Sequence, residues 1–178
     1  DRNWGNESSY ELRGLRQRLL AKVGRREEAM ESAWADFAKH PSAYGYADFM
    51  KYVPRNARDA WHQRAMQQAK AVDLRGFIET CVETREWERL STRVLDVHHE
   101  QLEGISHYVT ERAAQGLTRK HPPAAAKVYR ALAMRILKAG KSKYYSFALA
   151  HLRTAKRLYD KLAEHAEWQT IVDQIRRD

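Results

Sequence analysis

Apolar residues recur at spacings of three and four along most of the chain, and short breaks containing glycine or proline separate the runs. Such spacing places apolar side chains on one side of an α-helix. The first run puts four aliphatic residues on one side of the expected helix: Leu12, Leu15, Leu19 and Val23. Gly24 follows where the helix would end. We expect this stripe to face the core.

The same pattern predicts about ten helices, most of them 10 to 20 residues long. The expected helices span approximately residues 7–23, 26–38, 42–53, 56–71, 73–82, 87–97, 102–116, 122–138, 142–162 and 164–177. Turns of two to five residues between them force neighbouring helices to run antiparallel. No alternating strand pattern of useful length is present, so the sequence predicts an all-α fold.

The expected helices fall into pairs that begin near Glu7, Ser42 and Asp73, at intervals of about 31 to 35 residues. This period is typical of helical repeat proteins, in which each hairpin buries its apolar face against its neighbours. We therefore predict antiparallel helix-turn-helix repeats stacked as a short solenoid. Residues 1–178 would form a single helical-repeat domain. Because the chain begins at Asp1 and stops within an expected helix, it reads as a piece of a longer protein.

Two segments resemble known repeat families. LLAKVGRREEAMESAWADFAKHPS resembles a tetratricopeptide hairpin. Ala29 lies early in its second helix, followed by Phe37 in the same helix and by Pro41 beyond it. YELRGLRQRLLAKVGRREEAMESAWADFAKHPS and HPPAAAKVYRALAMRILKAGKSKYYSFALAHL together resemble the helical region that follows SWIM zinc fingers in bacterial proteins. These resemblances imply a TPR-like interaction module without assigned chemistry. The zinc-binding CxCx…CxH element is absent from this sequence, so no metal function is implied.

Composition supports a folded, cytoplasmic protein. The chain is 43% apolar and has only four prolines and eight glycines. Cys81 is its only cysteine, so an intramolecular disulfide cannot form, and a reducing compartment fits best. No secretory signal and no apolar run of membrane-spanning length is apparent, which predicts no membrane partner.

The sequence offers weak candidates for catalysis or metal binding. Cys81 lies in an apolar stripe, where a buried and inert thiol is expected. His99, Glu103 and His107 are spaced by four and would share one side of a helix, where they could hold zinc or iron. The favoured interpretation is a solvated helix side with a local His–Glu hydrogen bond. We therefore expect no enzymatic activity, no cofactor and no metal.

Charge is the feature that the expected helices do not explain. Residues 112–159 hold twelve Lys or Arg and no Asp or Glu, so this segment carries +12 within a chain of net charge +9. We call residues 112–159 the basic segment. A helical wheel places Lys120, Lys127, Arg130, Arg135 and Lys138 opposite the apolar stripe of their helix, as an outward face. Tyr145 and Phe147 flank the stripe of the next helix and are expected to be partly exposed.

A basic surface without interspersed acids indicates an anionic partner. The residues expected to bind it are Arg119, Lys120, Lys127, Arg130, Arg135, Lys138, Lys141, Lys143, Arg153, Lys156 and Arg157. One interpretation is a non-enzymatic scaffold whose helical stack binds another protein or another domain of its parent chain. The alternative is an accessory domain that binds the nucleic-acid backbone through this face.

Overall fold

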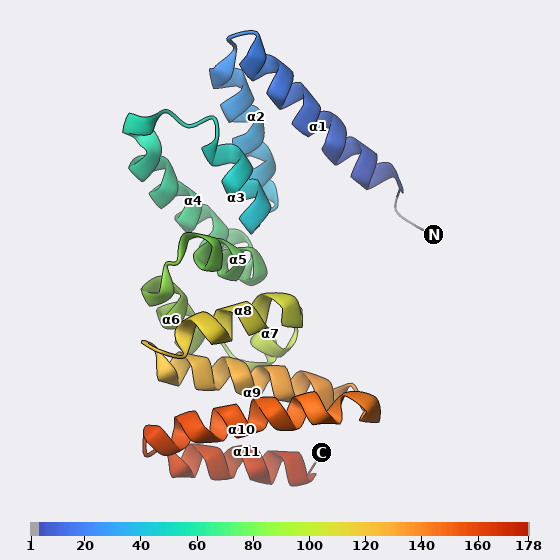
Figure 1. Ribbon diagram of the computed structural model, residues 1–178, viewed down its shortest axis with the longest axis vertical. Helices are drawn as coiled ribbons and strands as arrows, with labels where there is room; N and C mark the ends of the chain where they lie inside the picture. The colour runs from blue at the N-terminus through green and yellow to red at the C-terminus, as the bar shows by residue number, and fades with distance from the viewer. Residues whose placement is uncertain (1–3, 178) are drawn as a thin grey trace. The chain divides into compact units, whose positions relative to one another are not determined.

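A computed structural model describes the backbone of residues 4–177 and the side chains of residues 11–177 (Figure 1). Within residues 4–177 every regular element is helical, and the all-α prediction is confirmed. The chain divides into two compact units, residues 1–80 and 81–178, and the division falls inside helix α5. Each unit has its own packing.

The first unit contains α1 (Trp4–Lys22), α2 (Arg26–Lys39), α3 (Ala43–Met50), a short 3-10 turn (Arg55–Ala57), α4 (Arg58–Val72) and the start of α5 (Leu74–Thr84). The second contains the end of α5 and then α6 (Trp87–Asp96), α7 (His99–Glu103), α8 (His107–Leu117), α9 (Pro122–Lys138), a 3-10 turn (Ser142–Tyr144), α10 (Tyr145–Lys161) and α11 (His165–Arg177). In both units consecutive helices are joined by short turns, as expected for helical hairpins.

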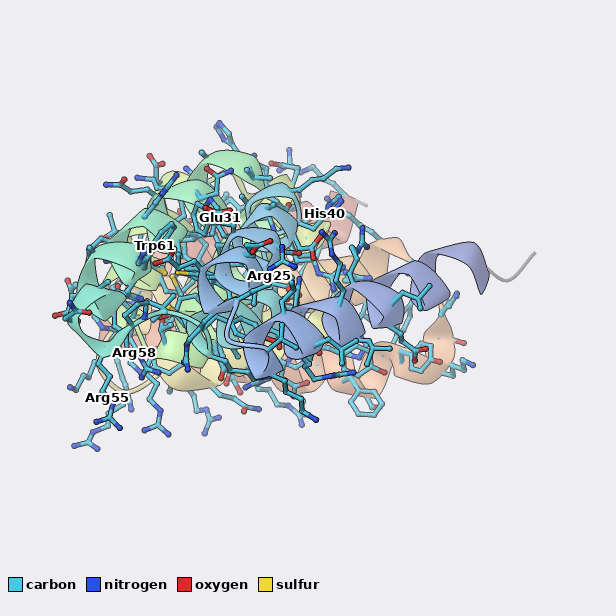
Figure 2. All side chains as sticks on the ribbon, turned by 90° about the horizontal axis from the view of Figure 1, so that it is seen from above. Arg25, Glu31, His40, Arg55, Arg58 and Trp61 are labelled. Atoms are coloured by element: carbon cyan, nitrogen blue, oxygen red, sulfur yellow. The ribbon has the colours of Figure 1, made fainter. Side chains whose placement is uncertain are left out.

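An aromatic cluster holds α2, α3 and α4 together in the first unit. The ring centroids of Trp34, Phe49 and Trp61 lie 5.2–5.4 Å from one another. Figure 2 labels Trp61 on α4. The Arg64 guanidinium lies 4.7 Å from the centroids of both tryptophan rings, which adds cation–π attraction. These large, mutually packed rings give three short helices a common core.

The beginning of α5 lies against Pro41, two residues beyond the end of α2. A Cβ atom at Gly76 would lie 2.8 Å from the carbonyl carbon of Pro41, closer than real Cβ contacts allow. The Asp73 side chain accepts a hydrogen bond of 2.7 Å from the Gly76 amide and so caps the same helix start. Glycine is therefore required here by the approach of another backbone, although its own backbone is helical.

Helix α9 is the centre of the second unit. It packs against α6, α7 and α8 and also against α10, which lies between α9 and α11 in Figure 1. Its buried residues point in nearly every direction around the helix: Ala124, Ala125, Ala126, Val128, Arg130, Ala131, Leu132, Ala133 and Met134. Many of these side chains are alanine, which lets neighbouring helices approach closely on more than one side.

Two local predictions are wrong. The expected helix over residues 102–116 is interrupted, because α7 ends at Glu103 and α8 begins at His107. Gly104 forms the C-cap and Ser106 the N-cap, both residue types that favour helix ends over helix interiors. The intervening turn changes the direction of the chain.

The apolar stripe of α1 faces solvent, although we expected it to face the core. Leu12, Leu15, Leu19 and Val23 are 64%, 45%, 52% and 69% exposed, although we expected them in the core. Helix α1 instead packs inward through Gln17, which is only 2% exposed, and through the partly buried Leu20 and Ala21. The Gln17 amide donates hydrogen bonds to the Asp36 carboxylate (3.0 Å) and the Ser32 hydroxyl (3.3 Å) of α2. These bonds, together with the apolar contacts of Leu20 and Ala21, fix which side of α1 faces inward.

Candidate docking groove between α10 and α11

The four cations of α9 make contacts inside the second unit. The predicted outward orientation is wrong for Lys127, Arg130 and Arg135, whereas Lys138 is exposed as predicted. Lys127 donates to the carbonyl oxygens of Leu95 (2.9 Å) and Val97 (2.5 Å) at the end of α6. Arg135 donates to the carbonyl oxygen of Ile105, just after α7. Carbonyls at helix ends have no partner within their own helix. Both half-buried cations therefore stabilise the ends of neighbouring helices.

The remaining two α9 cations converge on one carboxylate. Lys138 Nζ lies 2.6 Å from Glu103 Oε2, and Arg130 Nη1 lies 3.7 Å from Glu103 Oε1. The side chains of Glu103 and Arg130 are each only 7% exposed. Arg130 also donates a 2.7 Å hydrogen bond to the side-chain oxygen of Gln174 on α11. This cluster joins α7, α9 and α11.

The electrostatics of this region follow from burial. Burial lowers the pKa of His99 to about 4, and the nearby charges of Arg130 and Lys127 add to the effect. Burial also lowers the pKa of Lys127, with Arg130 as the next cause. Burial raises the pKa of Tyr159 to about 12. Neutral His99 and protonated Tyr159 are the forms that this partly dry environment favours.

The predicted solvated side formed by His99, Glu103 and His107 is not present. The break between α7 and α8 places His107 on a different helix, and Glu103 is buried against cations. Among the residues that the structure describes, no group of three His, Cys, Asp or Glu side chains is close enough to hold a metal ion. Cys81 is fully buried, as expected, and burial raises the pKa of its thiol to about 12.

Eight of the eleven candidate cations are exposed, among them Lys138 at the end of α9. Arg119 and Lys120 lie before α9, Lys141 and Lys143 lie in the turn before α10, and Arg153, Lys156 and Arg157 lie on α10. Two of the α10 cations have local partners. Lys156 pairs with Asp160 at 2.7 Å, and Arg157 donates to the Thr154 hydroxyl at 3.3 Å. These exposed contacts are weak and can be exchanged for others.

Two of these cations border an apolar groove between α10 and α11. The groove has a volume of about 390 Å³. Its apolar lining consists of Leu149, Leu152, Trp168, Val172 and Ile175, and its charged lining consists of Arg153, Lys156 and Arg176. No carboxylate is part of this lining in the described portion of the chain. We call these eight residues the α10–α11 groove.

The local sequence explains how the groove forms. On α10, Leu149, Leu152 and Lys156 recur at three- and four-residue spacing, and on α11 Trp168, Val172 and Ile175 do the same. Residues at this spacing share one side of a helix. The side of α10 that packs away from the groove buries Ala148, Ala155 and Tyr159. Helix α10 is thus apolar over a wider arc than its own core contacts require.

Exposed aromatic residues extend the apolar surface at the start of α10. Tyr145 is 40% exposed and Phe147 is 59% exposed, which confirms the expectation of partial exposure. Tyr144 (42%) and Leu149 (52%) are also exposed. The Lys143 ammonium lies 4.8 Å from the centroid of the Tyr144 ring. Apolar and cationic groups therefore occur together at this end of α10.

The part of the groove contributed by α11 lies outside the basic segment. The prediction from charge, which rested on residues 112–159, therefore did not include it. Arg176 follows Ile175 near the chain end, where acidic residues balance the local charge. The spacing of apolar residues in α11 was the sequence feature that could have identified this wall of the groove. Helix α11 carries four large apolar residues at helical spacing, of which only Ile171 is fully buried.

These features define an all-α protein of antiparallel helical hairpins with an apolar, cation-bordered groove. The chain belongs to the family described as "Family of unknown function (DUF6880)", whose model matches residues 2–176. No curated protein and no solved structure matches it. Among the described helices, none is long and apolar enough to cross a membrane.

Proposed function

We propose that the chain is a non-enzymatic, TPR-like scaffold of the cytoplasm that docks an amphipathic helix with acidic flanks into the α10–α11 groove. The helix belongs to another protein or to another domain of the parent chain. The observation that carries this proposal is the lining of the groove, in which five apolar residues are accompanied by three cations and no carboxylate. Helix-in-groove recognition uses such an apolar seam for affinity and flanking charge for selectivity.

Several features support a protein partner over a chemical substrate. The groove is lined by long aliphatic side chains and one indole, with no hydroxyl, imidazole or thiol among its lining residues. The resemblance to tetratricopeptide hairpins and to the helical region after SWIM zinc fingers points to the same class of function. Repeat proteins of this kind bind partners on surfaces shared by adjacent helices.

The test uses synthetic peptides of about 18 residues, long enough for five helical turns. One carries leucines at helical spacing with glutamates on both flanks, and the other has lysines in place of the glutamates. Fluorescence anisotropy at physiological salt should show the acidic peptide binding at least about tenfold more tightly. Leu149→Ser and Arg153→Glu should each weaken it by about tenfold or more, as expected for central groove residues.

Matched controls lie in the same unit but outside the groove. Tyr108 is 75% exposed on α8, and Lys161 is exposed at the end of α10. Tyr108→Ser and Lys161→Glu should leave peptide affinity within about twofold. Equal binding of the two peptides, or equal losses in the groove and control variants, would overturn the proposal.

Nucleic-acid backbone binding is the second candidate, and the eight exposed cations favour it. The internal contacts of Lys127, Arg130, Arg135 and Lys138 make charge reversal at these four positions a test of folding as much as of binding. The suitable variant combines Lys141→Glu, Lys143→Glu, Arg153→Glu and Arg157→Glu.

If this candidate is correct, duplex DNA binds with an affinity that falls steeply with salt, by roughly 0.9 in log–log slope for each phosphate contacted. The four-cation variant should then lose DNA binding while its circular dichroism spectrum is unchanged. That result, together with no selective binding of the acidic peptide, would replace the scaffold proposal. No salt-sensitive retention of DNA would eliminate the nucleic-acid candidate.

A further inference from the structure

A pocket separate from the α10–α11 groove lies where the start of α9 meets the end of α10 and the start of α11. Its volume is about 540 Å³, within the range of sites that hold small ligands. The residues that line it, which we call the α9–α11 pocket, are Leu95, His99, Pro123, Lys127, Tyr159, Glu164, Ala166 and Glu167. The pocket shares no residue with the α10–α11 groove.

The turn between α10 and α11 brings two carboxylates to this pocket. Ala163 has a φ of 57°, the left-handed conformation in which helices commonly end. The Glu164 amide then donates a 3.0 Å hydrogen bond to the carbonyl oxygen of Tyr159. Glu167 follows in the first turn of α11, three residues after Glu164, so the two side chains are neighbours on one side of the helix start. Both are exposed, and neither forms an ion pair with another described residue.

The hydroxyl of Tyr159 is the second polar feature of the pocket. Acidic residues are common at helix starts, so the two carboxylates alone would indicate no ligand. Tyr159 is only 4% exposed, and its hydroxyl makes no hydrogen bond with a described residue, although buried tyrosine hydroxyls usually find a partner. The hydroxyl oxygen is not sealed in the interior, and the side chain lines the pocket. An unpaired hydroxyl is therefore open to the pocket.

The charge of the lining favours a cationic ligand. Glu164 and Glu167 contribute two negative charges, whereas Lys127 contributes one positive charge. The Lys127 ammonium already donates to two backbone carbonyl oxygens at the end of α6. Because burial lowers the pKa of His99 to about 4, its imidazole is neutral at pH 7 and adds no positive charge. Carboxylates only accept hydrogen bonds, so the open polar groups call for a donor.

The surroundings of these polar groups define the rest of the ligand. Arg130 also lies near His99 but is not part of the lining, and the buried carboxylate of Glu103 balances its charge at 3.7 Å. Between the polar groups the lining is apolar and consists of Leu95, Pro123 and Ala166. An aliphatic chain that carries a cationic donor matches this combination.

We propose that the α9–α11 pocket binds an aliphatic primary ammonium group, carried either by a small free amine or by the side chain of a lysine. The ammonium donates its N–H groups to the carboxylates of Glu164 and Glu167 and to the hydroxyl oxygen of Tyr159. Its methylene chain packs against the apolar part of the lining. This binding site is independent of the helix docking proposed for the α10–α11 groove.

Probes of equal chain length separate the effect of charge from that of apolar contact: pentylammonium, 1-pentanol and pentanoate. The assay is a nuclear magnetic resonance titration of the isotope-labelled chain, read at the backbone amides of Ala166 and Glu167. Pentylammonium should shift these signals with saturation and a Kd of about 1–10 mM, as expected for so small a ligand. Pentanol should bind at least about tenfold more weakly, and pentanoate should bind more weakly still, because the carboxylates repel it.

Blocked tripeptides then distinguish the two sources of the ammonium group. One has a central lysine, and the other has a central norleucine, which lacks the ammonium. If the lysine peptide binds at least about threefold more tightly than pentylammonium, a protein lysine is the ligand, and otherwise a free amine is. The norleucine peptide should not bind in either case.

Substitutions test the residues assigned to the pocket. Glu164→Gln with Glu167→Gln keeps the side-chain shapes, removes both charges and should weaken pentylammonium binding by at least about tenfold. Tyr159→Phe removes only the hydroxyl and should weaken it by about threefold to tenfold. Glu88→Gln is the matched control, since its side chain is 89% exposed on α6 and does not line the pocket, and it should leave the affinity within about twofold. Leu149→Ser should also leave amine binding unchanged, so this proposal and the docking proposal can fail separately.

Three outcomes would overturn the proposal. One is the absence of a saturable shift at about tenfold above the expected Kd. Another is pentanol binding as tightly as pentylammonium, since charge would then not be recognised. The third is an unchanged affinity in the Glu164→Gln, Glu167→Gln variant. Because both substituted glutamates are exposed, this variant should keep the helical circular dichroism spectrum of the parent chain.

Discussion

Glu103→Leu removes the carboxylate that Arg130 and Lys138 share. Arg130 would remain only 7% exposed and without its nearby negative charge. At the observed 3.7 Å, an effective dielectric constant of about 20 gives an attraction of roughly 4 kcal/mol. This agrees with the cost of about 3–5 kcal/mol for breaking a buried pair from one side. Lys138 is 44% exposed and regains water, so it should add little.

The assay is urea unfolding at pH 7, followed by circular dichroism. We expect Glu103→Leu to lower the free energy of unfolding by about 3–5 kcal/mol. The double variant with Arg130→Met should lose about 1–3 kcal/mol less than the sum of the single variants, because no buried charge is then left alone. Glu100→Leu, at an exposed position on α7, should change stability by under about 0.5 kcal/mol. A loss below about 1 kcal/mol for Glu103→Leu, or strict additivity, would refute the internal role assigned to the α9 cations.

Three further expectations follow from burial and close contact. Gly76→Ala should destabilise the chain by about 1–3 kcal/mol in urea unfolding, because the new Cβ meets the Pro41 backbone, whereas Gly14→Ala, where the added Cβ meets open space, should stabilise it by roughly 0.5–1 kcal/mol; opposite signs would contradict the assigned contacts. His99 has its pKa lowered by burial from 6.5 to about 4, so the unfolded chain binds its proton first, and the free energy of unfolding should fall by up to roughly 3 kcal/mol between about pH 6.5 and pH 4. His99→Gln should flatten this part of the pH profile, and an unchanged profile would rule out the histidine as its source. Burial raises the pKa of the Cys81 thiol to about 12, so a thiol reagent should label the native protein at pH 8 far more slowly than the urea-unfolded protein, and fast native labelling would contradict its burial.

Helix positions were predictable because they depend on neighbours in sequence. The spacing of apolar residues gave most helix bounds to within a few residues, and the missed break between α7 and α8 lies where Gly104 and Ser106 favour helix ends. The direction that an apolar stripe faces was harder to predict from the sequence. Gln17 helps to fix which side of α1 faces the core, through hydrogen bonds to residues 15 and 19 positions away in sequence. No local sequence pattern encodes such a contact.

The candidate site could be predicted from the sequence only in part, for a similar reason. The absence of acidic residues in the basic segment indicated an external anion, but the partners of the α9 cations lie 27 or more residues away in sequence. The alanine-rich composition of α9 was the missed signal, since small residues on every side indicate a helix enclosed by neighbours. Arg153 and Lys156 do border a groove, although its other wall, α11, lies outside the basic segment.

The bonds from Lys127 and Arg135 to backbone carbonyls have an evolutionary consequence. A carboxylate partner must be retained as a particular side chain, whereas every residue type supplies a carbonyl oxygen. Leu95, Val97 and Ile105 can therefore be replaced in relatives without loss of these bonds, provided that the helix ends stay in place. Lys127 and Arg135 would then be conserved without any covarying partner residue. In aligned sequences, two residues conserved for their intramolecular hydrogen bonds would look like part of a binding surface.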